Sequence, residues 1–276
     1  MNYQRKIDFA INLLRSIPQD GPIELSYSGG KDSDVVLELA KMAGIPFEAI
    51  YKQTTIDPPG TTAHVREVGA TIIRPKETFL QLIEKKGNPS RYKRFCCEAL
   101  KEYKIHDRAI QGIRRSESTK RAERYHEPEI CRTYPGKEKV RVYLPILEWT
   151  DEDVARFVKE RGIKCHPLYY DEAGRFHAER RLGCIGCPLK ADNGLADFKR
   201  YPKLLKAEIA AYQKWLDNHT GNETYKFLDG KAYNAYFYTF FCKSRDHFTA
   251  VLTGGLFPDS AVDTKAYMER EFNIEF

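Results

Sequence analysis

The sequence has no run of roughly 18 or more apolar residues, the length that a transmembrane helix needs, so a membrane-spanning protein is excluded. The first segment does not fit a signal peptide, because Asp8, Asn12 and Arg15 interrupt its apolar stretch and no small-residue cleavage site follows. No residue class is depleted enough for a disordered chain, and no internal repeat is present. We therefore expect the 276 residues to form a soluble, cytoplasmic globular protein.

Seven cysteines are present in a chain without export features. In a reducing compartment, metal binding or redox chemistry is more common for such residues than a disulfide framework. The seven positions are Cys96, Cys97, Cys131, Cys165, Cys184, Cys187 and Cys242.

Positive charge is concentrated in one part of the chain. The 45 lysines and arginines outnumber the 39 aspartates and glutamates, and residues 85–141 alone hold 17 basic and 8 acidic side chains. Such a segment favours an anionic ligand, for example a nucleotide phosphate, sulfate or a nucleic-acid backbone. A solvated basic face beside a long loop is the equally weighted alternative.

Short β-like runs alternate with helical periodicity in the first half, which indicates an α/β fold with a Rossmann-like parallel sheet flanked by helices. Apolar residues between 35 and 43 share one helix face, and Gly44 and Pro46 end that helix. Residues 75–106 predict two helical pieces, broken at 87–89. The expected strands are 23–27, 46–51, 70–74, 109–113 and 140–144.

The pattern changes after Pro145, where helices and loops replace the strands. Thr150 predicts an N-cap for a helix that Gly162 ends, and residues 196–218 predict a helical segment. The aromatic residues near the C-terminus, between 233 and 241, are expected to form core. We therefore expect a nucleotide-binding α/β domain at 1–148 and a mainly helical, cysteine-containing region at 149–276, packed on the first.

The stretch Ser28–Ser33, with the sequence SGGKDS, follows the first expected strand and opens a helix. Backbone N–H groups and the helix dipole converge there on an anion, while the two glycines allow close approach. The serines add hydroxyl donors and Lys31 adds a positive charge. These features predict a phosphate-binding loop, and a simple Gly-Gly turn is the alternative.

This loop resembles the pyrophosphate (PP) loop of the adenine-nucleotide α-hydrolase superfamily, which includes ATP pyrophosphatases and tRNA thiolases. Within that superfamily, five further stretches in the same order resemble the phosphoadenylyl-sulfate (PAPS) reductase family. They are TTIDPP at 54–59, CCEALK at 96–101, GIRRSES at 112–118, PILEWT at 145–150 and GCIGCP at 183–188. The resemblance covers residues 20–190 and implies a fold and an enzymatic activity of this kind.

The resemblance implies an adenine-nucleotide site at the carboxyl ends of the strands. Lys31, Asp32 and Arg114 are the expected catalytic residues, with Lys31 and Arg114 stabilising charge on the phosphates. A surface ion pair between Arg114 and Glu117 is the alternative for that arginine. The full expected nucleotide-binding set is Tyr27, Ser28, Gly29, Gly30, Lys31, Asp32, Ser33, Thr55, Asp57, Arg114, Arg115 and Glu117.

Two cysteine pairs, Cys96 with Cys97 and Cys184 with Cys187, form a candidate metal site. Four thiolates bind a [4Fe-4S] cluster or tetrahedral zinc, and adjacent cysteines suit the cubane better. The arrangement is similar to that of bacterial assimilatory adenylyl-sulfate reductases, which implies the cluster. Buried, unligated thiols are the third alternative.

One family feature is missing, because sulfonucleotide reductases carry a nucleophilic cysteine in a short C-terminal tail and residues 268–276 here contain none. The resemblance then favours ATP- and Mg²⁺-dependent adenylation with sulfur transfer, as in the thiolation branch of the superfamily. The alternatives are an adenylyl-sulfate or PAPS reductase that forms sulfite, and a non-catalytic nucleic-acid-binding protein. The expected partners are an adenine nucleotide and a nucleic acid or a sulfur-donor protein, and the sequence leaves homo-oligomer formation open.

Overall fold

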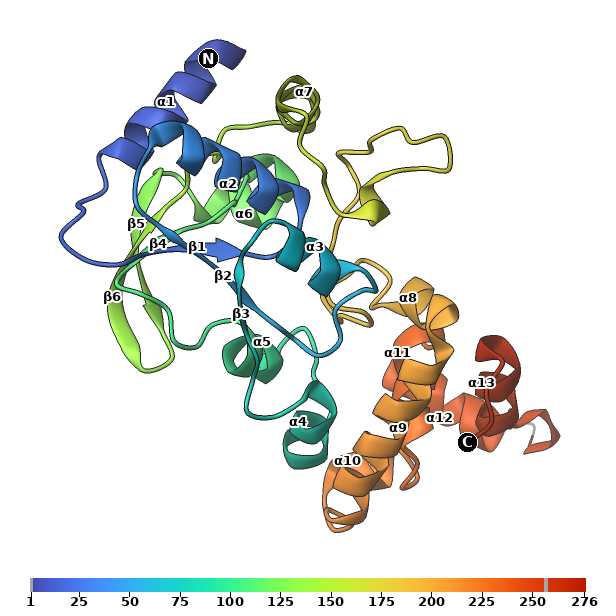
Figure 1. The fold of residues 1–276 in the computed structure, drawn as a ribbon. Helices are drawn as coiled ribbons and strands as arrows, with labels where there is room; N and C mark the ends of the chain where they lie inside the picture. Colours follow the sequence, from blue (N-terminus) through green and yellow to red (C-terminus); the bar gives the residue numbers. More distant parts are fainter. Residues whose placement is uncertain (1, 256–257) are drawn as a thin grey trace. The chain divides into compact units, whose positions relative to one another are not determined.

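The computed structural model describes residues 2–255 and 258–276 of the chain. It contains two compact units, of which the first comprises Met1–Pro75 and Cys97–Gly183 and the second Lys76–Cys96 and Cys184–Phe276. Figure 1 traces the chain through both. The expected functional division at residue 148 stays a prediction; residues 149–183 lie in the first compact unit.

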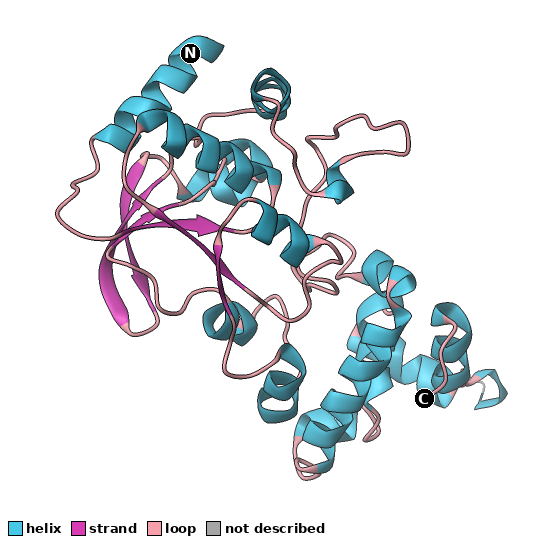
Figure 2. Ribbon diagram, in the orientation of Figure 1, coloured by secondary structure: helices cyan, strands magenta, loops and turns pink. Residues whose placement is uncertain are grey.

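The first unit is built on a six-stranded sheet with the strand order β3-β2-β1-β4-β6-β5, coloured magenta in Figure 2. Every neighbouring pair is parallel except β5 and β6, which are antiparallel. The expected α/β, Rossmann-like class is therefore confirmed. The strands are β1 (Ile23–Tyr27), β2 (Glu48–Lys52), β3 (Thr71–Ile73), β4 (Arg108–Ile110), β5 (Glu129–Tyr134) and β6 (Lys137–Tyr143).

The central position of β1 follows from its residues. Ile23, Leu25 and Tyr27 are buried, and the strand pairs with β2 on one side and β4 on the other. Helix α2 (Lys31–Ala43) packs against β1, and α1 (Tyr3–Arg15) packs on α2. These elements place the loop between β1 and α2 at the carboxyl edge of the sheet (Figure 1).

The glycines and the threonine that were expected to bound two helices do so in the structure. Gly44 ends α2 in the left-handed conformation with φ +69°, and Gly162 ends α7 (Asp151–Arg161) in the same way with φ +63°. Thr150 caps α7 in a capping box with Asp153. The remaining elements of this unit are α3 (Thr61–Glu67), η1 (Arg115–Glu117), α6 (Thr119–Arg124) and η2 (Pro167–Tyr169), while α5 (Phe95–Leu100) spans the boundary between the units.

Strand β5 was not predicted from the sequence. Along Glu129–Tyr134 the side chains alternate between exposed and partly buried positions, and only Tyr134 is fully buried. Because this strand lies at the edge of the sheet, it carries little of the apolar signal that marks the central strands. The turn at 135–136, with Gly136 at φ +72°, joins it to β6 as a hairpin.

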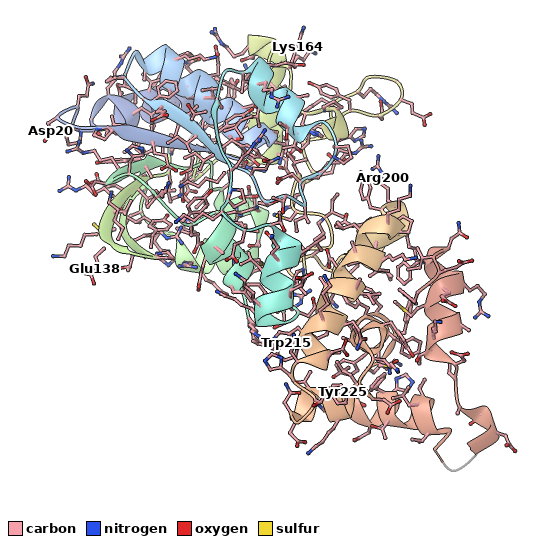
Figure 3. The ribbon with its side chains drawn as sticks, turned by 60° about the horizontal axis from the view of Figure 1, so that its bottom comes forward. Asp20, Glu138, Lys164, Arg200, Trp215 and Tyr225 are labelled. Atoms are coloured by element: carbon pink, nitrogen blue, oxygen red, sulfur yellow. The ribbon has the colours of Figure 1, made fainter. Side chains whose placement is uncertain are left out.

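The second unit is helical, and Figure 3 shows its side chains, including Trp215 and Tyr225. In it α4 packs on α9, and α11 packs on α9 and α13. The break expected at 87–89 is present, because α4 ends at Lys86 and α5 begins at Phe95. The helices are α4 (Phe79–Lys86), α8 (Leu195–Arg200), α9 (Pro202–Asp217), α10 (Glu223–Phe227), α11 (Ala232–Phe241), α12 (Arg245–Thr253), η3 (Pro258–Ser260) and α13 (Thr264–Phe272).

The helical segment expected over residues 196–218 is present, but it is divided into two helices. Two helices, α8 and α9, meet at Tyr201, because Pro202 lacks the N–H that a continuous helix needs and instead starts α9. Of the aromatic residues of α11, Tyr236 and Phe237 belong to the core and are each 4% exposed, while the other four are partly buried. No helix in the described ranges is long and apolar enough to cross a membrane.

Candidate functional site

The loop that joins β1 to α2 turns sharply at its two glycines. Gly29 has a φ of +78°, and a Cβ there would lie 3.1 Å from Thr61 Cγ2. A Cβ on Gly30 would lie 3.1 Å from the hydroxyl of Tyr169. The loop therefore packs closely against its neighbours, and the positive φ of Gly29 favours glycine at that position.

Hydrogen bonds within the loop set its shape. The Ser33 hydroxyl donates to the Gly30 carbonyl at 2.7 Å, and the Ser28 hydroxyl donates to Ser33 Oγ at 3.2 Å. The Gly30 N–H points to Ser28 Oγ at 3.4 Å. Both expected serines thus hold the shape of the loop and of the first turn of α2.

Gly112 brings the end of β4 against the same turn. A Cβ at this position would lie 2.9 Å from the backbone oxygen of Asp32 and 3.3 Å from the nitrogen of Ser33. Only a residue without a side chain permits that approach. The sequence marked Gly112 solely as part of a longer motif, and its packing role was missed.

The three expected catalytic residues lie together. Asp32 Oδ1 accepts from Arg114 Nε at 2.7 Å, and Asp32 Oδ2 accepts from Lys31 Nζ at 3.0 Å. Lys31 and Arg114 are each only 2% exposed. One carboxylate thus joins two buried cations beside the glycine loop, and the Lys31 ammonium also lies 5.4 Å from the centre of the Tyr169 ring.

Arg114 does not form the surface ion pair that was the alternative for it. Its guanidinium donates to Asp32 and to Asp151 Oδ1, the latter at 2.8 Å. The contact with Glu117 comes from the Arg114 backbone N–H, which donates to Glu117 Oε2 at 3.2 Å. The Glu117 carboxylate also pairs with Arg121, so it orients the turn after β4.

Two other expected residues point elsewhere or hold local structure. Arg115 is directed to Glu148, with Nη1 3.0 Å from Oε1, at an exposed position. Asp57 accepts from the backbone N–H and the hydroxyl of Thr54 at 2.8 and 2.7 Å, and it thereby fixes the loop after β2. Within that loop Thr55 has a φ of +67°, a strained conformation for a β-branched residue.

Tyr27 belongs to a buried cluster that the sequence did not reveal. Its hydroxyl donates to Asp34 Oδ1 and lies 3.0 Å from His64 Nε2, which itself lies 2.9 Å from Asp34 Oδ1. Burial, with the nearby Asp34, raises the pKa of the Tyr27 hydroxyl and of the Cys165 thiol. Both groups therefore stay protonated, and Cys165 is no activated nucleophile.

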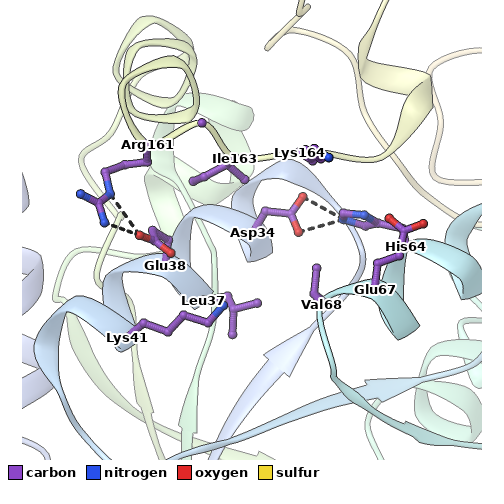
Figure 4. A pocket seen from close by; sticks show the side chains of 11 residues that line it. Asp34, Leu37, Glu38, Lys41, His64, Glu67, Val68, Arg161, Ile163 and Lys164 are labelled. Atoms are coloured by element: carbon purple, nitrogen blue, oxygen red, sulfur yellow. Dashed lines mark hydrogen bonds and ion pairs between the residues drawn. The ribbon is translucent and has the colours of Figure 1, made fainter.

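A pocket of about 310 Å³ adjoins this cluster between α2, α3 and the turn after α7 (Figure 4). Two carboxylates on the pocket wall already have partners. Asp34 pairs with His64, and Glu38 accepts from Arg161 at 2.6 and 3.0 Å. Figure 4 shows both pairs. The pocket thus borders the side of the α2 first turn that carries Asp34.

The four cysteines of the candidate metal site are half-buried. Cys97 falls in the first compact unit, whereas Cys96, Cys184 and Cys187 fall in the second. Thiols are the donor type that an iron-sulfur cluster or zinc uses. Among residues 2–255 and 258–276, no group of three or more His, Cys, Asp or Glu side chains is placed to hold a metal ion.

Several known proteins are similar in sequence to this chain. An Escherichia phage 186 protein named only by its size and gene position is 34% identical over 160 residues, covering 52% of this chain and 44% of that protein. Sulfate adenylyltransferase subunit 2 of Azospirillum brasilense is 32% identical over 181 residues, covering 53% and 60%. An uncharacterised Methanocaldococcus jannaschii protein is 28% identical over 240 residues, covering 80% and 48%.

The chain spans about half the length of the phage protein and of the Methanocaldococcus jannaschii protein. A crystal structure of PAPS reductase from Candida auris, in a phosphate complex, matches with a TM-score of 0.47 and 15% identity over 66% of this chain and 93% of that one. The profile of the phosphoadenosine phosphosulfate reductase domain matches residues 22–190, which include the glycine loop, Arg114 and all four cysteines of the two pairs. By that match the chain belongs to the phosphoadenosine phosphosulfate reductase domain family.

Proposed function

We propose that this protein is an enzyme that binds ATP at the Ser28–Ser33 loop, adenylates an acceptor oxygen and promotes its replacement by sulfur. The observation that carries the proposal is the position of Lys31 and Arg114, two buried cations beside the open N-terminal turn of α2. Membership of a family whose relatives include a sulfate adenylyltransferase subunit supports adenine-nucleotide chemistry.

In the first step, the acceptor oxygen attacks the α-phosphorus of Mg-ATP. The new O–P bond forms as the α–β anhydride bond breaks, and pyrophosphate leaves with the bonding electrons. Lys31 and Arg114 stabilise the negative charge that grows on the phosphate oxygens, while the loop N–H groups hold the leaving pyrophosphate. Asp32 positions both cations through its two oxygens.

In the second step, a hydrosulfide-level sulfur nucleophile displaces the adenylate at carbon. A C–S bond forms, the C–O bond breaks, AMP leaves with the electron pair, and the sulfur loses a proton to solvent. When bound by Cys96, Cys97, Cys184 and Cys187, a [4Fe-4S] cluster would supply a place for sulfur, and zinc is the alternative. The chain's own contribution to this step is to hold the AMP portion at the carboxyl ends of the strands.

Pyrophosphate release from Mg-ATP with RNA or DNA acceptors tests the first step. We expect release from the wild-type protein and its loss in Lys31→Met, with exposed Lys159→Met as the matched control. Equal release by both variants would remove the loop from the mechanism.

The main alternative is a reductase that forms sulfite from adenylyl sulfate or PAPS. Family membership favours it, but burial raises the pKa of the Cys242 thiol, which makes that residue a poor nucleophile. Sulfite formation by anaerobic protein with thioredoxin would establish this reaction. A purely nucleic-acid-binding role, the third alternative, predicts neither sulfite nor pyrophosphate.

A further inference from the structure

The helical second unit contains a pocket of about 210 Å³ that several aromatic side chains line. It is lined by Phe198 of α8, Tyr236 and Phe240 of α11, and Tyr92 from the segment that follows α4. This volume is below the roughly 300 Å³ at the lower end for drug-sized ligands, so the pocket suits a single flat ring system.

A buried carboxyl group forms part of the pocket wall. Glu208 of α9 is 3% exposed, and its Oε1 has no hydrogen-bond partner among the described residues. Burial raises the pKa of Glu208 well above its usual range and so favours the neutral acid. A buried acceptor without a partner is unfavourable, and a ligand that donates a hydrogen bond would relieve that cost.

The neighbours of Glu208 define which of its oxygens is available. The Tyr236 hydroxyl lies 3.2 Å from Glu208 Oε2 and 3.2 Å from Asn88 Oδ1. Tyrosine carries one proton, and the geometry allows it to donate that proton to Glu208 Oε2 or to Asn88 Oδ1. When the proton goes to Asn88, the neutral acid donates its own proton from Oε2 to the tyrosine oxygen. This chain of hydrogen bonds leaves Oε1 as a carbonyl-type acceptor.

The rim of the pocket combines an aromatic ring with positive charge. Tyr92 is 99% exposed, which is unusual for so large an apolar surface. Arg91 is fixed beside it, since its guanidinium donates to the Lys190 carbonyl at 2.6 Å and to Asn193 Oδ1 at 3.1 Å. An exposed ring next to basic residues is the arrangement that stacks a base and attracts its phosphate.

We propose that this pocket binds an unpaired nucleobase, which stacks on Tyr92 and donates an N–H hydrogen bond to Glu208 Oε1. A purely apolar ligand would leave Oε1 unsatisfied, and a base within a duplex could not reach a buried group. The base could be presented by a single-stranded nucleic acid or by a free nucleotide. A single-stranded nucleic acid in this pocket would be the acceptor of the proposed reaction, and to that extent the inference rests on the proposed function. The binding of the base itself does not depend on adenylation.

Fluorescence anisotropy with the full-length protein and a labelled single-stranded oligonucleotide tests this proposal. Tyr92→Ala should weaken binding by about tenfold, the size of one lost base-aromatic stack. Phe9→Ala removes an aromatic residue that is 40% exposed in the other unit and should leave the affinity unchanged. Competition by nucleosides and nucleoside monophosphates shows whether a free ligand suffices or a strand is required.

Two substitutions at Glu208 isolate the acceptor. Glu208→Gln keeps a carbonyl oxygen and supplies an N–H₂ donor to Tyr236, so it should bind like the wild-type protein. Glu208→Leu has a similar volume without the acceptor and should bind several-fold more weakly, with thermal unfolding checked for each variant.

The proposal is overturned if no strand, nucleoside or nucleotide binds in a Tyr92-dependent way, if a matched duplex binds as tightly, or if Glu208→Leu binds like the wild type. Pyrophosphate release is measured separately, so loss of base binding with intact release would refute the pocket and leave the proposed reaction standing.

Discussion

Asp32 joins Lys31 and Arg114 through its two carboxylate oxygens, and its 2.7 Å contact with Arg114 links helix α2 to the segment that follows β4. The two residues are 82 positions apart in the chain. The expected cations of the phosphate site are therefore already assembled by a carboxylate of the same loop, with charges and donors that match a polyphosphate.

Arg114→Ala should abolish most nucleotide binding and destabilise the fold by about 3 kcal/mol, because it removes one of the two buried cations that pair with Asp32. Arg115→Ala is the matched control. Its side chain is 38% exposed, so a change within about 0.5 kcal/mol is expected. Urea unfolding and calorimetric titration with ATP measure the two effects, and equal behaviour of both variants would contradict the assignment of Arg114.

Gly112→Ala should cost about 1–3 kcal/mol, since the new Cβ would lie 2.9 Å from the Asp32 backbone oxygen. The displaced turn should also bind ATP more weakly. Gly221→Ala is a suitable control because a Cβ there meets nothing within 4 Å. Thermal unfolding of the pair checks the prediction, which fails if Gly112→Ala melts at the wild-type temperature.

The pair formed by His64 and Asp34 should make stability depend on pH. Burial alone would lower the pKa of His64, but the hydrogen bond and charge of Asp34 outweigh it and raise the pKa above 6.5. The stabilisation is then complete below pH 6.5 and is lost as the pH rises through the raised value.

His64→Gln should reduce the pH dependence of the free energy of unfolding above pH 6.5. Substitution of the exposed His247 by Gln should leave the wild-type pH dependence unchanged. His166 acts in the opposite sense, because burial lowers its pKa and it destabilises the fold as the pH falls below 6.5. Urea titrations between about pH 5.5 and pH 8.5, from roughly one unit below to two units above the pKa of an unperturbed histidine, measure these slopes. An unchanged alkaline slope in His64→Gln would show that another group titrates.

Anaerobically purified protein should contain about four iron and four sulfide per chain if the two cysteine pairs hold a cubane. Cys184→Ser should lose most of the metal, whereas exposed Cys131→Ser should retain it. Zinc in place of iron would favour the tetrahedral site, and metal retained by Cys184→Ser would contradict the ligand assignment.

The fold could be predicted wherever local and global signals agree. Buried strand β1, the glycine that ends α2 and the capping box of α7 each carry their own pattern, and the structure contains all three. Edge strand β5 lacked such a pattern because its side chains face solvent in part. The Pro202 break was visible, but the apolar periodicity on both sides of it obscured the end of α8.

The candidate site divides in the same way. The glycine loop, Lys31 and Arg114 were identified by residue type and order. The contacts of Asp34 with Tyr27 and His64 depend on tertiary packing, as does the approach of Gly112, and no spacing in the sequence encodes them. The pocket around Glu208 is lined by several separate segments of the second unit, so the sequence could not distinguish its acid from an ordinary helix residue.

The first turn of α2 is fastened on both of its sides, by Asp32 to Arg114 and by Asp34 to Tyr27 and His64. A turn anchored in this manner has little freedom to lose when an anion arrives, so the entropic penalty of association should be small. We therefore expect the backbone of the loop to have the same conformation with and without a bound nucleotide.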